Sequence, residues 1–416
     1  MTTLSIIIPA FNEESGIAQI VERVLSIREP LQGAGAALEL IVVDDGSRDR
    51  TKAQVALYPD ARLIRHAVNR GYGAAIKTGF RQASGEYLAF LDADGTYPPE
   101  SLPEMFRTAV QQKADLVIGS RMSGAHSEMP LTRRVGNLAF AALLSLIGNV
   151  TVRDTSSGMR LLRRDVLPRL YPLPDGLQFT PAMSTRAIHE NLHIYEFPIA
   201  YAERVGRSKL SVVHDGFRFT NAIVWTALAY NPVRILGMIS LAALAIAGLI
   251  GFYFLALRLS GVTTLTAPQV YALGAAALLV VTGISLFTLG AMFNYLVALF
   301  HKGPVRQGLF GKPIFRTPLD HHFGWMGIAA MLAGSLLGAG TFVASLGGWE
   351  IGRVWFYLLV SAMLIISGLQ LSIAWIVMRI LEELAQREAS VRRELTESGA
   401  IHEEVGGILT RGNEPG

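Results

Sequence analysis

Two short acidic segments have the residue types and spacing that suit chemistry on a phosphorylated ligand. DDGS at 44–47 and DADGT at 92–96 each follow an apolar run. Alternate residues of an extended segment point to the same side, so Asp92 and Asp94 can direct two carboxylates at one hard cation such as Mg²⁺ or Mn²⁺. Such a cation neutralises a diphosphate and stabilises it as a leaving group. An Asp-x-Asp triplet is also common at turns, so alone it is weak support.

The adjacent carboxylates Asp44 and Asp45 are costly to place together. A buried pair of like charges repels unless hydrogen bonds or a cation compensate. One use for such a pair is to accept hydrogen bonds from the base and ribose of a nucleotide. The alternative is structural, because Asp and Ser are favourable N-caps for a following helix. The doublet alone does not decide between these two roles.

A strand that ends in DADGT occurs in two different classes of enzyme. In a phosphatase of the haloacid dehalogenase type, Asp92 would be the nucleophile and Asp94 the acid/base. In a nucleotide-sugar glycosyltransferase, both would hold the metal. The phosphatase pattern needs its second acidic pair later in the chain, whereas here the doublet comes earlier and none follows a strand beyond Gly119. The order of the motifs therefore favours the glycosyltransferase.

The elements that must position these carboxylates alternate between β-rich runs and helical stretches. Strands are predicted at 4–8, 38–43, 61–66, 86–91 and 115–119, and helices at 13–28, 49–57, 73–83 and 99–112. This alternation predicts an α/β fold with a doubly wound, mostly parallel sheet. Ligands of such sheets bind beyond the carboxyl ends of the strands, so both acidic segments are expected at one edge.

The composition divides the chain into a polar N-terminal part and an apolar C-terminal part. Charged residues make up 17% of the chain and hydrophobic residues 51%, whereas soluble domains carry about 25% charge. Uncharged segments longer than the roughly 18 residues needed to cross a bilayer occur at 235–257, 270–300, 324–346 and 354–378. The predicted organisation is a catalytic head (1–211), a surface helix (212–233), four transmembrane helices (234–378) and a charged tail (379–416) that frays into disorder.

The segment 131–148 is too short and too one-sided to span a bilayer, and it begins with Arg133 and Arg134. We predict that it lies on the bilayer surface, as 212–233 does; an ordinary amphipathic core helix is the alternative. Basic residues gather in the loop after 300 and in the tail, which predicts a cytoplasmic head and cytoplasmic termini in the plasma membrane. The N-terminus lacks the features of a signal peptide.

The basic net charge of +4 fits the flanks of a membrane protein, and no basic helix interleaved with aromatic residues suggests nucleic-acid binding. The chain has no cysteine, which excludes a disulfide framework, a thiol nucleophile and a zinc–thiolate site.

The motifs, in their order and spacing, resemble glycosyltransferase family 2, and more narrowly its dolichyl/polyprenyl-phosphate mannose or glucose synthases. They are IIIPAFNEESGI, IVVDDGSRDRT, NRGYGAAIKTGF, FLDADG and VIGSRM. Two later segments, RDTSSGMR at 153–160 and ERVGRSKLS at 203–211, are characteristic of the lipid-phosphate branch. The likeness covers the head, while the membrane segments match only loosely.

The resemblance implies a glycosyltransferase-A fold and a role for individual residues. The nucleotide-sugar pocket would be lined by Pro9, Phe11, Glu13, Asp45 and Gly71. Asp92 and Asp94 would hold Mg²⁺ or Mn²⁺ and, through it, the diphosphate. Relatives often carry Gln two residues after the second Asp, as a further metal ligand, but this chain has Thr96 there.

Basic residues complete the implied site, because arginine forks match phosphate oxygens. Arg204 and Lys209 would contact the nucleotide sugar, and Arg121 and Arg134 the acceptor phosphate. Asp154 would position the acceptor or balance charge, which makes Asp94, Asp154 and Arg121 the expected catalytic residues. The alternatives are solvated surface cations for the basic residues and a turn residue for Asp154.

The implied reaction is inverting transfer of mannose from GDP-mannose, or of glucose from UDP-glucose, to a polyprenyl phosphate such as dolichyl or undecaprenyl phosphate. The second pKa of a phosphate monoester is about 6, so the acceptor needs no strong general base. One alternative is a processive polysaccharide synthase, although its usual Gln-x-x-Arg-Trp is absent. Another is an inactive membrane scaffold or transport protein. Relatives also imply a homo-oligomer.

Overall fold

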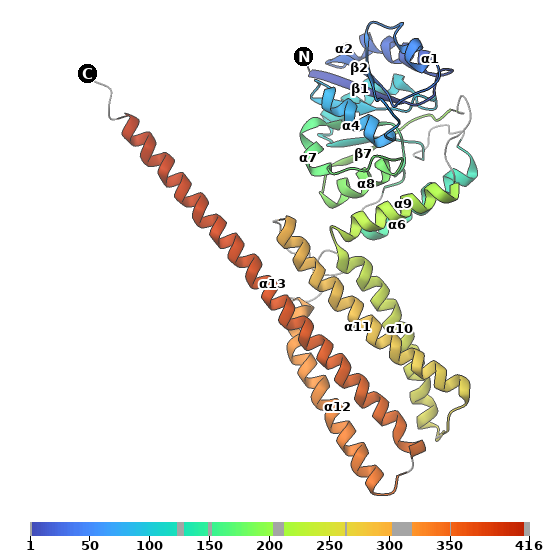
Figure 1. Ribbon diagram of the computed structural model, residues 1–416, viewed down its shortest axis with the longest axis vertical. Helices are drawn as coiled ribbons and strands as arrows, with labels where there is room; N and C mark the ends of the chain where they lie inside the picture. Colours follow the sequence, from blue (N-terminus) through green and yellow to red (C-terminus); the bar gives the residue numbers. More distant parts are fainter. Residues whose placement is uncertain are drawn as a thin grey trace. The chain divides into compact units, whose positions relative to one another are not determined.

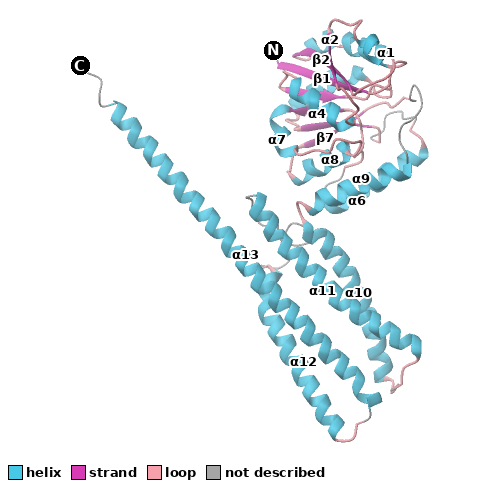
Figure 2. Cartoon of the chain, viewed as in Figure 1, coloured by secondary structure: helices cyan, strands magenta, loops and turns pink. Residues whose placement is uncertain are grey.

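The chain forms two compact units, Met1–Ala227 and Leu228–Gly416. The computed structural model describes residues 2–122, 129–148, 152–202, 212–262, 264–301, 318–349 and 351–411. The first unit contains a seven-stranded sheet with helices packed on it, and the second is helical (Figures 1 and 2).

The sheet of the first unit has the strand order β3-β2-β1-β4-β6-β5-β7. Its strands are β1 (Thr2–Ala10), β2 (Ala36–Asp44), β3 (Ala61–Arg65), β4 (Tyr87–Phe90), β5 (Leu116–Ser120), β6 (Arg160–Arg163) and β7 (Ile194–Pro198). Strands β1 to β4 are mutually parallel, and β6 runs antiparallel to both β4 and β5. The mostly parallel sheet is as predicted, and the acidic segments follow the strands β2 and β4, which lie on either side of β1.

The helices of this unit cover both faces of the sheet (Figure 2). They are α1 (Ile17–Ser26), α2 (Arg28–Gly33), α3 (Thr51–Val55), α4 (Tyr72–Gln82), α5 (Leu102–Gln111), α6 (Leu131–Gly148), α7 (Leu167–Leu170), α8 (Phe179–His189) and α9 (Val212–Leu228), with 3-10 turns η1 (Pro99–Ser101) and η2 (Arg164–Val166). Apolar residues of α1 and α5 pack in one core with alternate residues of the strands.

Helix α4 is fixed on the other face, and its N-terminus carries the NRGYG loop to the carboxyl edge. Phe80 of α4, Phe90 of β4 and Phe179 of α8 form an aromatic cluster with ring centroids 5.9–6.5 Å apart. Each such pair adds roughly 0.5–1.5 kcal/mol beyond the area it buries. A Cβ at Gly79 would lie 2.4 Å from Ile7 Cγ2, so α4 sits directly on β1.

The second unit contains α10 (Pro232–Leu259), α11 (Ala267–His301), η3 (Leu319–His322), α12 (Phe323–Leu346) and α13 (Ile351–Arg411). Within the described residues, four stretches are long and apolar enough to cross a membrane, at Pro232–Leu259, Ala267–Phe300, Leu319–Leu346 and Val354–Leu384. They agree with the four predicted segments and extend each of them. The tail was expected to fray, but α13 continues through it as far as Arg411, in keeping with its many Glu, Ala, Leu and Arg helix formers.

The GxxxG of α12 marks a close helix contact. A Cβ at Gly334 would lie 2.8 Å from the carbonyl oxygen of Ser361 on α13, and one at Gly338 would lie 2.7 Å from its hydroxyl. The Ser361 hydroxyl donates a hydrogen bond of 2.7 Å to the Gly334 carbonyl. Small residues that let backbones approach in this way are a common device for packing helices in membranes.

We expect Gly334→Leu to destabilise the helical unit by about 1–3 kcal/mol, the usual cost of overpacking a well-packed contact. Gly340→Leu on the same helix is the matched control, because a Cβ there meets no atom within 4 Å. Thermal unfolding of the detergent-solubilised protein measures the difference. Equal midpoints for the two variants would show that the α12–α13 contact does not depend on these glycines.

Candidate active site at the carboxyl edge of the sheet

The DDGS segment divides its two carboxylates between two tasks. Asp44 forms a turn, with its Oδ1 accepting a 2.8 Å hydrogen bond from the backbone N–H of Ser47, and Arg65 Nε lies 3.2 Å from its Oδ2. Gly46 has φ 78°, and a Cβ there would lie 2.7 Å from the backbone of Asn69. Asp44 therefore has a structural role as a turn residue, but it does not cap the following helix α3, whose N-cap residue is Arg50 and has no side-chain cap hydrogen bond.

Asp45 holds the NRGYG loop. Its Oδ1 accepts a 2.9 Å bond from the backbone N–H of Arg70 and lies 2.6 Å from His66 Nδ1, and its Oδ2 accepts a 2.8 Å bond from Gly71. Gly71 itself has φ 105°, and a Cβ on it would lie 2.5 Å from the Asp175 carbonyl oxygen. This buried carboxylate thus fixes the shape of the loop that precedes α4.

The segment after β1 is joined to the DDGS turn by backbone hydrogen bonds. The N–H of Asn12 donates to Ser47 Oγ, and that of Glu13 donates to Thr51 Oγ1, each over 2.9 Å. Pro9, at the end of β1, is buried, while Phe11 and Glu13 are half-buried. The residues predicted to line the nucleoside pocket therefore come from adjoining segments at one edge of the sheet.

The DADGT carboxylates are each oriented by a hydroxyl group. Tyr72 donates a 2.8 Å hydrogen bond to Asp92 Oδ1, and Thr96 donates a 2.6 Å bond to Asp94 Oδ1. Burial, reinforced by the Asp92 carboxylate, raises the pKa of Tyr72 well above its usual value, so the phenol remains a neutral donor. Thr96, which replaces the family's Gln, supports the Asp94 carboxylate.

Gly158 of the DTSSG segment packs directly against Asp92. A Cβ at position 158 would lie 2.4 Å from Asp92 Oδ2. The segment is held from below by Arg160, a fully buried residue that donates to the carbonyls of Thr155 (2.7 Å) and Ser157 (3.1 Å). Burial lowers the pKa of Arg160 to about 10. Gly158, Arg160 and Tyr72 lie in segments that the family resemblance singled out, but sequence alone indicated no role of their own for these three residues.

Asp92 and Asp94 fit a cation that takes most of its ligands from substrate and water. Among the residues that the structure describes, no group of three or more His, Asp or Glu side chains is placed to hold a metal ion. Mg²⁺ does not need such a cage, because it is commonly bound by one or two carboxylates together with substrate phosphates and waters. The donor set is therefore adequate for a metal that arrives with a diphosphate.

Arg121 and Asp154 form a buried, two-pronged ion pair. Arg121 Nε and Nη2 donate to Asp154 over 2.8 and 2.7 Å, and the guanidinium lies 5.9 and 5.3 Å from the ring centroids of Tyr97 and Tyr201. Asp154 is 0% exposed. Burial opposes its ionisation, but the Arg121 guanidinium outweighs that effect and holds the pKa of the carboxyl below its usual range. The structure thus joins these two expected catalytic residues in one ion pair, in which the Arg121 guanidinium is bound to Asp154.

Helix α6 is tied to this ion pair through Asn137. The Asn137 side chain donates to the Arg153 carbonyl over 3.2 Å and accepts from Ser156 Oγ over 2.9 Å. Arg134, one turn earlier on α6, lines an apolar groove of about 460 Å³, whose other lining residues are Met122, Leu138, Ala141, Ala142, Ser145, Val152 and Arg153. Arg204 and Lys209 lie outside the described residues.

Comparison with known proteins assigns the chain to a family. Residues 5–170 match the family described as Glycosyl transferase family 2. Over 225 residues the chain is 32% identical to the dolichyl-phosphate hexose transferase of Haloferax volcanii, with 54% of this chain and 94% of that protein covered. The chain belongs to glycosyl transferase family 2. The order of the motifs had favoured this class of enzyme, a glycosyltransferase, over a phosphatase.

Other relatives show how far the likeness extends. The low-salt glycan biosynthesis hexosyltransferase Agl6 of H. volcanii is 34% identical over 231 residues, and the match spans about half of each protein (55% of this chain, 54% of Agl6). The undecaprenyl-phosphate 4-deoxy-4-formamido-L-arabinose transferase of Photorhabdus laumondii is 28% identical over 316 residues, and the match covers 74% of this chain and 92% of that protein. Residues 232–392 match a family described as Domain of unknown function (DUF8752).

The chain was also compared with solved structures. The glucosyl-3-phosphoglycerate synthase of Mycobacterium tuberculosis is 22% identical, with a TM-score of 0.43 and with 55% of this chain and 80% of that chain covered.

Proposed function

We propose that this glycosyltransferase moves a hexose from a nucleotide-diphosphate sugar to a membrane polyprenyl phosphate, with inversion at the anomeric carbon. The observation that carries the proposal is the groove on α6. It pairs two cations, Arg134 and Arg153, with an apolar wall, and Asn137 links it to the Asp154–Arg121 pair. An anionic head joined to a hydrocarbon chain has the chemistry that such a groove would bind. The names of the relatives, which transfer sugars to dolichyl or undecaprenyl phosphate, support this acceptor.

The surface of α6 supports an acceptor held in a bilayer. Four large aliphatic side chains on it are at least half exposed, namely Leu131, Val135, Leu138 and Leu146. Helix α9 exposes Phe217 and Trp225, and the two helices touch through the rings of Phe140 and Phe219, 5.7 Å apart. Contiguous exposed apolar surface of this kind marks a membrane or partner contact. We infer that α6 and α9 lie at the membrane surface.

The donor is proposed to occupy the edge between the segments after β1, β2 and β4. Asp45 Oδ2 accepts one hydrogen bond from the described chain, and a carboxylate oxygen can accept two, which leaves capacity for a ribose hydroxyl. Phe11, Glu13 and the loop at Gly71 would surround the nucleoside. GDP-mannose and UDP-glucose both suit this arrangement, and Arg204 and Lys209 would complete the contacts to the donor.

Asp92 and Asp94 are proposed to hold Mg²⁺ or Mn²⁺, which when bound would supply Lewis-acid stabilisation of the diphosphate leaving group. Tyr72 and Thr96 orient these two carboxylates, and Gly158 allows Asp92 its position.

The acceptor phosphate is already largely ionised at neutral pH, so the protein's task is to bring together two anions that repel each other. Arg134 and Arg153 would bind the phosphate, and the Asp154–Arg121 ion pair would hold the adjoining protein segment in position. The Lys and Arg residues of the loop after residue 300 and the Arg residues of the tail favour a cytoplasmic head in the plasma membrane, and assembly as a homo-oligomer is proposed from the family likeness.

A panel of radiolabelled nucleotide sugars, offered with undecaprenyl phosphate and Mn²⁺, tests the proposed function. We expect a lipid-soluble labelled product from one donor, formed only when the acceptor is present. Label released as free hexose would contradict an acceptor phosphate, and label in a long polymer would indicate a processive synthase.

The same assay tests the groove through Arg134→Gln. Because Arg134 would contact only the acceptor, we expect the KM for undecaprenyl phosphate to rise roughly tenfold, the equivalent of one charge-assisted hydrogen bond, with the donor KM unchanged. Arg107→Gln, at an exposed position of α5, is the control with the same loss of charge.

A further inference from the structure

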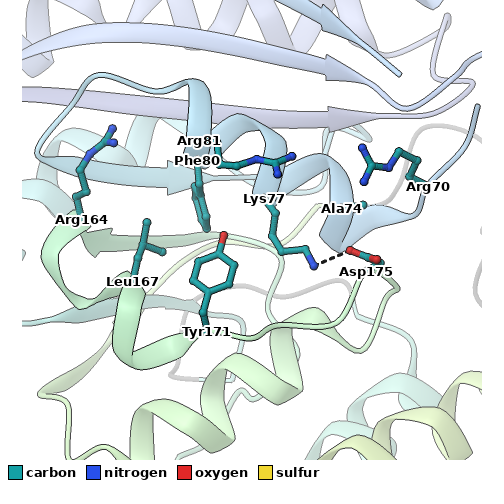
Figure 3. Close-up of a pocket in the computed structure, with 9 residues that line it drawn as sticks. All are labelled: Arg70, Ala74, Lys77, Phe80, Arg81, Arg164, Leu167, Tyr171 and Asp175. Carbon is teal, nitrogen blue, oxygen red and sulfur yellow. Dashed lines mark ion pairs between the residues drawn. The ribbon is translucent and has the colours of Figure 1, made fainter. Parts of the chain in front are cut away.

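A second concavity in the first unit lies between α4 and the segment that runs from η2 to Asp175 (Figure 3). Its volume is about 510 Å³. Four of its lining side chains are cations and one is a carboxylate: Arg70, Lys77, Arg81 and Arg164 against Asp175. The lining thus carries three more positive charges than negative ones. Nothing in the proposed transfer reaction uses this concavity.

Two of the cations are held in place by backbone carbonyls. Arg164 donates from Nε to Gly85 and from Nη2 to Ala83, both over 2.6 Å. Lys77 Nζ donates to the Leu173 carbonyl over 2.7 Å and lies 2.6 Å from Asp175 Oδ1. Their ammonium and guanidinium groups are therefore fixed beside the cavity, at a cost in side-chain entropy that an ordinary solvated surface cation does not incur.

The charges of the described side chains that line this cavity do not balance. Lys77 and Arg81 are four residues apart on α4, and like charges at that spacing destabilise a helix. Asp175 lies against Lys77, and the one hydrogen bond that the structure gives to the Arg81 side chain is to the Thr78 hydroxyl, at 3.1 Å. An anion in the cavity would relieve this repulsion, and each cation would add a charge-assisted hydrogen bond to it.

The cavity also has a wall suited to an organic group. Figure 3 shows the ring of Tyr171 and the side chain of Leu167 on the side opposite Lys77 and Arg81. Half-buried Tyr171 adds a phenol that can donate a hydrogen bond. A ligand with a charged end and a neutral organic end would use both sides.

We propose that this concavity binds a phosphate monoester, with the phosphate on Lys77, Arg81 and Arg164 and the organic part on Tyr171 and Leu167, at a site separate from that of the nucleotide sugar. A soluble phosphate ester and the headgroup of an anionic lipid have this chemistry in common. The site adjoins the donor loop, because the Asp175 carbonyl accepts a 3.1 Å hydrogen bond from Ala74 at the start of α4.

The test uses the full-length protein in neutral detergent. Glycerol 3-phosphate, measured by calorimetry in EDTA, is the soluble probe. Phosphatidic acid, counted by native mass spectrometry against phosphatidylcholine, is the lipid probe. We expect saturable binding of at least one probe. If only glycerol 3-phosphate binds, the ligand is a free phosphate ester. If only phosphatidic acid binds, the ligand is a lipid headgroup. If both bind, the site recognises the chemistry that the two share. Binding of neither overturns the proposal.

Arg81→Gln is the first variant, because the Arg81 side chain is exposed and its one hydrogen bond in the described chain is to Thr78. Lys77→Gln is the second. Each is expected to weaken binding roughly tenfold, and Arg107→Gln on α5, with the same loss of charge, is expected to leave it unchanged. Equal affinity in the native protein and both cavity variants, or an equal loss in the control, would refute the site. So would displacement of the probe by a nucleoside diphosphate with Mn²⁺, since the two ligands would then share one site.

Discussion

Asp94→Asn is expected to lower kcat for hexosyl transfer by about a thousandfold. Stabilisation of a leaving group by a metal ion is worth several kcal/mol, and each ~1.4 kcal/mol is a factor of ten in rate. Asparagine keeps the size of the side chain and its contact with Thr96, but it removes the charge that would hold the cation. Initial rates measured over a range of Mn²⁺ concentrations give the effect.

Thr96→Val is the matched control for this experiment. It removes the hydroxyl that donates a 2.6 Å hydrogen bond to Asp94 Oδ1 but leaves the carboxylate in place. Loss of an outer hydrogen-bond partner of a metal ligand typically costs about 10–100-fold in metal affinity or activity, so we expect a smaller defect that higher Mn²⁺ reverses. Undiminished turnover by Asp94→Asn would show that the DADGT carboxylates do not carry the chemistry.

Asp154→Asn is expected to destabilise the head by about 3–5 kcal/mol, because it leaves the Arg121 charge buried without its carboxylate. The double variant Arg121→Met/Asp154→Leu removes both charges and replaces them with apolar groups of similar volume. Such replacements are often neutral or stabilising, so we expect near-native thermal unfolding but lost transfer activity. A fully active double variant would show that this ion pair has no part in the reaction.

The same pair makes a specific prediction for the pH dependence of stability. The pKa of Asp154 is lower in the folded protein than in the unfolded chain, where it is about 3.9. The contribution of Asp154 to the free energy of unfolding is therefore complete at pH values above the unfolded-state pKa. It is lost as the pH falls through the lower folded-state pKa. Below pH ~4, the free energy of unfolding of the native protein should fall more steeply than that of the double variant.

The strands that sequence predicted well are those whose signal is local. Strands β1, β2, β4 and β5 each contain a run of buried apolar residues, and all four lie within two residues of their predicted bounds. Strand β6 was missed because its sequence, RLLR, begins and ends in arginine. Arg160 is buried there only because the carbonyls of Thr155 and Ser157 bind its guanidinium, which is a tertiary contact. Strand β7 is half-exposed and ends at a proline, so it lacked a clear apolar pattern.

The candidate site was predictable in its position but not in its internal bonds. The alternation of strands and helices placed Asp45 and Asp92 at one edge of a parallel sheet, and both residues follow parallel strands in the structure. That Asp45 binds the backbone of Arg70 and Gly71 depends on contacts between distant parts of the chain. The hydrogen bond from Tyr72 to Asp92 likewise depends on how α4 packs on the sheet. Periodicity and motif spacing contain no information about such pairs.

The contact between Gly158 and Asp92 places a constraint on protein engineering that links two motifs far apart in sequence. Any side chain at position 158 would displace the Asp92 carboxylate, so a segment grafted in place of DTSSG must bring a glycine at this position. Chimaeras that exchange this segment for one without the glycine should misplace Asp92, whereas those that keep the glycine should retain its geometry.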